Sequence, residues 1–77
     1  MKIQVLGTGC AKCKQLTSAA EKAVAELGLG VQVEKVEDLR EIVKFKVMST
    51  PALVVDGQVR STGKVLSVED VKGYLRG

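Results

Sequence analysis

The sequence predicts an α/β domain with the element order β-α-β-α-β-β-α, in which helices flank a four-stranded mixed sheet. Three observations predict this order. An apolar run near the N-terminus gives way to a long stretch of three- and four-residue apolar spacing, from Ala11 to Leu27, which is typical of a helix that packs on a sheet. Asp56-Gly57 separates two strand-like runs, as in a β-hairpin. A capping-box sequence that begins at Ser67 predicts a closing helix.

The first half of the chain predicts a strand, a long helix and a second strand. Residues 2–6 form a largely apolar strand that ends at the glycine-rich Gly7-Thr8-Gly9. The helix that follows stops at Gly28, and its expected core-facing positions are Cys13, Leu16, Ala20, Val24 and Leu27. The β-branched residues of 31–36 predict the second strand. Because a helix connects the two strands, they should run parallel with a right-handed crossover.

A short helix is predicted in the middle of the chain. Asp38 is placed to cap it, and Leu39, Ile42 and Val43 are expected to face inward. The helical pattern decays around residues 45–47. The short helix should therefore end well before the only proline of the chain.

The last third of the chain predicts a hairpin and the closing helix. Pro51 directly precedes the apolar run 52–55, and Asp56-Gly57 joins this run to residues 58–61. These two strands should be antiparallel neighbours. The closing helix follows the capping box of residues 67–70.

The composition excludes several classes of function. The chain of 77 residues suits one small domain, residues 1–77, and its apolar stretches are too short to span a bilayer. Its 12 Lys and Arg are spread among 9 acids, and one Tyr, one Phe and no Trp leave little to stack on bases. The first apolar run lacks the length of a signal peptide. We therefore expect a cytoplasmic protein with no nucleic-acid or membrane partner.

The two cysteines, Cys10 and Cys13, stand at the expected start of the long helix. A thiol there lies among unpaired backbone N–H groups at the positive end of the helix dipole, which favours the thiolate. A thiolate is either a nucleophile or a metal ligand. Because Cys13 falls on the core-facing side of the helix and Cys10 precedes it, the two sulfurs should be unequally exposed. Lys12 and Lys14 lie within a turn of Cys10, and their charge should favour its thiolate further.

Three interpretations compete for this pair: a redox dithiol, a metal site, or two small core residues that happen to be close. A disulfide across two intervening residues closes with little strain when the second cysteine lies one helical turn in. The chain also has no His, the commonest zinc ligand. In the reducing cytoplasm the pair is more typical of catalysis or metal binding than of a structural crosslink.

Taken together, the motifs resemble the thioredoxin fold. The resemblance rests on the Cys-x-x-Cys of Cys10 and Cys13 at a helix start, on the segment Met48-Ser49-Thr50-Pro51-Ala52-Leu53-Val54-Val55-Asp56-Gly57 and on the closing helix. It covers essentially the whole chain and is closest to the small, glutaredoxin-sized thioredoxins of archaea and bacteria, the redox-active disulfide proteins. It implies a thiol–disulfide oxidoreductase that needs no metal or organic cofactor, because the dithiol itself carries two electrons.

The resemblance also implies roles for individual residues. Cys10 would be the attacking thiolate and Cys13 the resolving thiol of a redox-active disulfide. Pro51 would be cis and packed beside that disulfide. The backbone of Thr50 would pair with an extended substrate segment that docks over Gly9, Cys10 and Pro51. The implied partners are disulfide-containing protein substrates and a separate electron donor that resembles thioredoxin reductase.

The chain departs from the usual thioredoxin pattern in two places. The common motif is Trp-Cys-Gly-Pro-Cys, whereas here Gly9 precedes Cys10 and Ala11-Lys12 lies between the cysteines. The redox potential of the family is therefore not transferred to this chain. Gln4 stands about where ordinary thioredoxins have a buried carboxylate that assists the resolving thiol, which leaves the proton acceptor of that thiol unassigned.

The main alternative is a carrier of copper or another soft metal that uses Cys10 and Cys13 as thiolate ligands. Such carriers also hold a Cys-x-x-Cys between a first strand and a first helix. They predict the order β-α-β-β-α-β. The closing helix and the short helix before Thr50-Pro51 favour the redox interpretation instead.

Overall fold

The helices and strands of the protein follow the predicted order β-α-β-α-β-β-α. The computed structural model describes residues 1–9 and 11–76. The elements are β1 (Ile3–Leu6), α1 (Ala11–Leu27), β2 (Val33–Val36), α2 (Leu39–Lys44), β3 (Ala52–Val55), β4 (Gln58–Thr62) and α3 (Val68–Leu75). The predicted fold class is confirmed, and the order is not the one expected of a copper carrier. In the described part of the chain, no helix combines the length and the apolar character that crossing a membrane would take.

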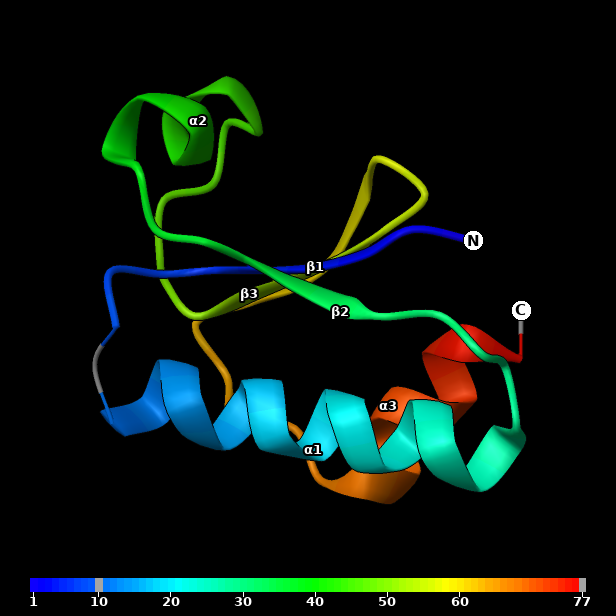
Figure 1. Cartoon of the computed structure of the whole chain (residues 1–77). Helices are drawn as coiled ribbons and strands as arrows, with labels where there is room; N and C mark the ends of the chain where they lie inside the picture. Colours follow the sequence, from blue (N-terminus) through cyan, green and yellow to red (C-terminus); the bar gives the residue numbers. More distant parts are fainter. Residues whose placement is uncertain (10, 77) are drawn as a thin grey trace.

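The strands form one mixed sheet in the order β2-β1-β3-β4. β1 runs parallel to β2 and antiparallel to β3, and β3 pairs antiparallel with β4. The predicted parallel pair and the predicted hairpin are both confirmed. α1 and α3 cover one face of the sheet and α2 lies on the other side (Figure 1). Because β1 and β2 are parallel, their C-terminal ends meet at one edge of the sheet, where the chain turns from β1 towards α1.

The face under α1 and α3 carries the larger core cluster. Ile3 of β1 and Leu53 of β3 are fully buried there against Leu16 of α1 and Val71 of α3. The alternation of a strand sends the neighbouring side chains to the other face, where Leu6, Ala52, Val54 and Ile42 form a smaller cluster. β1 and β3 are thus buried on both faces, as expected for the two central strands.

α3 is fixed at its start and is tied to α1. The predicted capping box is present: Ser67 Oγ accepts a hydrogen bond from the Asp70 N–H, and the Asp70 carboxylate accepts one from the Ser67 N–H. Lys72 forms ion pairs with Glu26 of α1 and Glu69 of α3. The hydrogen bond to Glu26 has the largest effect and raises the pKa of the Lys72 ammonium group above its ordinary value. Desolvation opposes this increase, and the hydrogen bond to Glu69 adds a smaller one.

α2 buries fewer side chains than the sequence predicts. Asp38 caps the helix as expected, because its carboxylate accepts a hydrogen bond of 2.9 Å from the Arg40 N–H. Of the three side chains expected to face inward, Ile42 is buried, but Leu39 and Val43 are 63% and 68% exposed. The prediction for Leu39 and Val43 is wrong because a helix of 6 residues makes fewer than two turns, so it directs a single position at the sheet.

Candidate functional site

Cys13 is buried in the first part of α1, on the side that faces the sheet, as predicted. Its sulfur lies against Gly7, directly after β1: a Cβ atom added at Gly7 would overlap Cys13 Sγ and would lie 3.1 Å from Cys13 Cβ. Glycine is therefore required at position 7, because any side chain there would occupy the space of the Cys13 sulfur. The Gly7 N–H donates to the Val36 carbonyl of β2 at 2.9 Å, which holds this backbone in place.

The backbone of Thr50-Pro51 approaches the same turn from β3. The Thr50–Pro51 peptide bond is cis, as the resemblance implies, and Pro51 is buried. Leu6 pairs with Ala52 across the antiparallel strands β1 and β3, so the residues just beyond them, Gly7 and Pro51, lie side by side. A Cβ atom at Gly7 would also be 3.9 Å from Thr50 Cβ. Segments far apart in the sequence thus meet beside Cys13.

A small cavity opens beside Cys13, with a volume of about 100 Å³. Its wall includes Gly7 and Gly9 from the turn after β1 and Thr17 from α1, whose hydroxyl donates to the Cys13 carbonyl at 2.9 Å. Val5 of β1 and three charged residues, namely Lys14, Lys35 and Glu37, complete the wall. A buried sulfur therefore lies on a space of a few water volumes that is also lined by one acidic and two basic residues, all three of them exposed to solvent.

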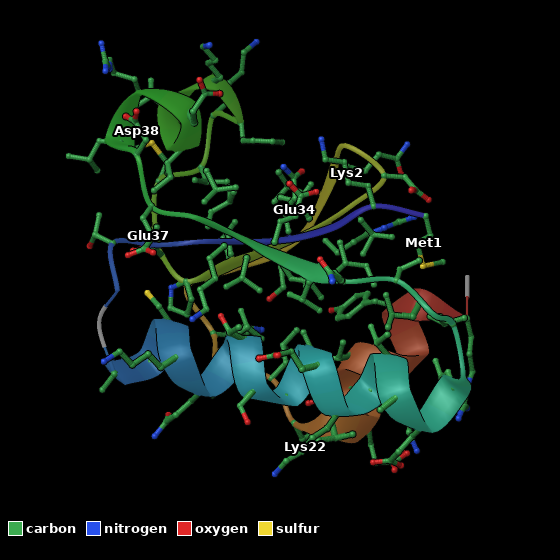
Figure 2. The ribbon with its side chains drawn as sticks, in the orientation of Figure 1. Met1, Lys2, Lys22, Glu34, Glu37 and Asp38 are labelled. Carbon is green, nitrogen blue, oxygen red and sulfur yellow. The ribbon has the colours of Figure 1, made fainter. Side chains whose placement is uncertain are left out.

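Glu37 reaches this cavity from the residue just beyond β2. A Cβ atom at Gly9 would lie 3.1 Å from Glu37 Oε2, so the carboxylate lies over the backbone of the turn between β1 and α1. Figure 2 shows Glu37 beside that turn. Gly9 also has a φ of +86°, a conformation that side-chain-bearing residues rarely adopt. Gly9 is thus required by its backbone conformation, whereas Gly7 is required by the sulfur packed against it.

The predicted site residues fall into three groups. Gly9, Cys13 and Lys14 line the one cavity, and Thr50 and Pro51 adjoin it through Gly7. Lys12 is exposed on α1 and is not among the described residues that line the cavity. Cys10, the predicted nucleophile, lies outside the described residues.

Sequence reasoning missed five residues of this site: the wall residues Val5, Thr17, Lys35 and Glu37, and the packing role of Gly7. A signal for Glu37 was present. The strands β1 and β2 were predicted to be parallel, and the C-terminal ends of parallel strands meet at one edge of a sheet. A carboxylate that directly follows the second strand is therefore expected near the turn that follows the first.

Comparison with known proteins identifies the family to which the chain belongs. Residues 1–76 match the family model described as a thioredoxin domain. A thioredoxin from Methanothermobacter thermautotrophicus is 41% identical over 75 residues, which covers 97% of this chain and 97% of that protein. A thioredoxin from Methanocaldococcus jannaschii is 40% identical over 74 residues, which covers 96% of this chain and 85% of that protein. With its fold, its Cys-x-x-Cys and these relatives, the chain belongs to the thioredoxin family and is a thiol–disulfide oxidoreductase.

Proposed function

We propose that this protein reduces disulfides of protein substrates through Cys10 and Cys13, with Cys10 as the nucleophile and Cys13 as the resolving thiol. The observation that carries the proposal is the position of the Cys13 sulfur, buried against Gly7 and beside the Thr50–Pro51 backbone. Cys10 directly precedes Ala11, the first residue of α1, where backbone N–H groups favour a thiolate.

The reaction has two steps. The Cys10 thiolate attacks one sulfur of the substrate disulfide, a bond forms between Cys10 and that sulfur, and the other substrate sulfur leaves as a thiolate. Cys13 then loses its proton and attacks Cys10 Sγ, which releases the second substrate sulfur and leaves a disulfide between Cys10 and Cys13. The substrate gains two electrons and the dithiol loses two. No metal or organic cofactor takes part.

Further residues and partners belong to the same proposal. A substrate segment docks over Gly9 and Pro51 and pairs with the Thr50 backbone, while Lys12 and Lys14 favour the Cys10 thiolate by their charge. A separate reductase of the thioredoxin-reductase type returns the two electrons. The protein acts as a single domain, residues 1–77, in the cytoplasm, where the thiol pool keeps such dithiols in turnover.

The test is reduction of insulin by dithiothreitol, combined with trapping of the mixed disulfide. The native protein should accelerate the reduction, and Cys10→Ser should abolish the acceleration. Cys13→Ser should accumulate a covalent complex with substrate, because it forms the mixed disulfide but does not resolve it. As a control, Ser18→Cys in the Cys10→Ser background adds a thiol at an exposed position of α1 and should not restore activity. A covalent complex with Cys10→Ser but not with Cys13→Ser would reverse the two roles.

A further inference from the structure

We propose that Glu37 is the general base of the second step: its carboxylate accepts the proton that the Cys13 thiol loses as Cys13 attacks the mixed disulfide. The inference rests on the proposed function and adds a catalytic residue to it. It gives the Cys13 proton an acceptor in a chain that has Gln4, an amide without basic character, where ordinary thioredoxins have a carboxylate.

The geometry places the acceptor and the donor on one small cavity. Cys13 and Glu37 both line the space of about 100 Å³ beside the turn after β1, which has room for a few water molecules. Gly7 packs against the Cys13 sulfur, and Gly9 lies under the Glu37 carboxylate. A side chain at either end of this short turn would therefore crowd one of the two groups. A proton therefore passes from the sulfur to the carboxylate through water held in this space.

The other polar groups around the cavity do not compete for this role. Lys35 of β2 and Lys14 of α1 are ammonium groups, which have donors but no acceptor. The Thr17 hydroxyl donates to the Cys13 carbonyl, and a neutral hydroxyl is too weak a base to hold the proton of a thiol. Gln4 pairs with Val54, which belongs to the cluster on the α2 side, so its side chain is directed to the other face of the sheet. Among the described residues that line the cavity, Glu37 is the one carboxylate.

The Cys13 S–H bond breaks and the proton goes to Glu37, while the electron pair left on Cys13 sulfur forms the bond to Cys10 sulfur. The bond between Cys10 and the substrate sulfur breaks, and the substrate sulfur leaves as a thiolate. The ammonium groups of Lys14 and Lys35 favour the negative charge that builds up on Cys13 before attack. Glu37 then returns its proton to solvent through the cavity.

Replacing Glu37 changes the rate of the second step in opposite directions, depending on whether its carboxylate acts as a base or only as a neighbouring charge. A carboxylate that acts only through its charge disfavours the Cys13 thiolate, so Glu37→Gln would speed the second step at neutral pH. A carboxylate that takes the proton speeds the same step, so Glu37→Gln would slow it. The direction of the change decides between the two.

The experiment follows the two steps separately by stopped-flow absorbance with 5,5′-dithiobis(2-nitrobenzoate), a disulfide reagent that releases one coloured thiolate per step. Glu37→Gln should leave the first release unchanged and slow the second by ~100-fold or more at neutral pH, within the range for general bases. The deficit should shrink as pH rises, because hydroxide then removes the proton. Glu37→Asp, which keeps the carboxylate, should restore part of the rate.

The matched control is Glu34→Gln, which removes the same charge from β2. Glu34 pairs with Lys2 and points to the opposite side of the sheet in Figure 2, so this variant should leave both releases unchanged. An unchanged or faster second release in Glu37→Gln, or an equal slowing in Glu34→Gln, would overturn the role of Glu37. The proposed function would fail on a different observation, namely a second release that persists in Cys13→Ser.

Discussion

α1 and α3 bury one face of the sheet thoroughly, whereas α2 covers the other face with a single buried side chain. Leu16 and Val71 are fully buried on the first face, while Leu39 and Val43 of α2 are largely exposed on the second. Cys13 belongs to the well-packed face. The difference teaches that the helix which carries the sulfur is held by the larger core, whereas none of the described residues that line the cavity beside Cys13 belongs to α2.

The largest expected effect comes from truncating the core on each face. Leu16→Ala should lower the free energy of unfolding by about 3 kcal/mol, because a fully buried leucine leaves a cavity that a long helix does not close. Ile42→Ala should cost about 2 kcal/mol, since a short helix is able to shift into the space. Urea denaturation measures both values. A larger loss for Ile42→Ala would reverse the ranking of the two faces.

A smaller loss of folding stability, together with a clear loss of reaction rate, is expected at the contact between Gly7 and the Cys13 sulfur. Gly7→Ala places a methyl group where Cys13 Sγ lies, so the sulfur must move. The free energy of unfolding should fall by about 1–2 kcal/mol, and the resolving step should slow by ~10-fold or more from misplacement. Gly73→Ala is the control, because a Cβ there meets nothing within 4 Å. An unchanged resolving step in Gly7→Ala would show that the sulfur has other productive positions.

The smallest effect is expected on the outer surface of α2. Leu39→Ser and Val43→Ser replace exposed side chains, so each should change the free energy of unfolding by less than about 0.5 kcal/mol. Urea denaturation, read against Ile42→Ala on the same helix, checks this. A loss comparable to that of Ile42→Ala would mean that α2 packs more deeply than its exposure indicates.

Local patterns were sufficient to predict the fold. Long apolar periodicity marks α1, the Asp56-Gly57 turn marks the hairpin, and the capping box at Ser67 marks α3; each is a short-range preference that the tertiary structure reinforces. The burial of α2 was mispredicted because periodicity does not tell how many turns of a short helix touch the sheet. Leu39 and Val43 have the right spacing but no partner surface.

The site was predictable in its chemistry and not in its surroundings. Cys13, Thr50 and Pro51 carry recognisable motifs, and the structure brings them to one edge of the sheet. Gly7 and Glu37 were missed because their roles depend on tertiary distances, the first to a sulfur on α1 and the second to the turn below it. Such distances follow from strand register, which a sequence pattern specifies less sharply than it specifies a helix.

The register of β1 has a consequence for how the redox site comes into being. Ile3 of β1 pairs with Val33 of β2 on one side and with Val55 of β3 on the other. The central strand is therefore complete only after β3, which is far away in the sequence, has paired with it, and this closes a long loop of chain. The cysteine motif sits in a segment that is able to form a helix early, but the backbone of Pro51 reaches it only through those distant pairings. A nascent chain released before β3 would therefore carry both thiols without the Thr50–Pro51 backbone that lies beside Cys13 in the folded protein.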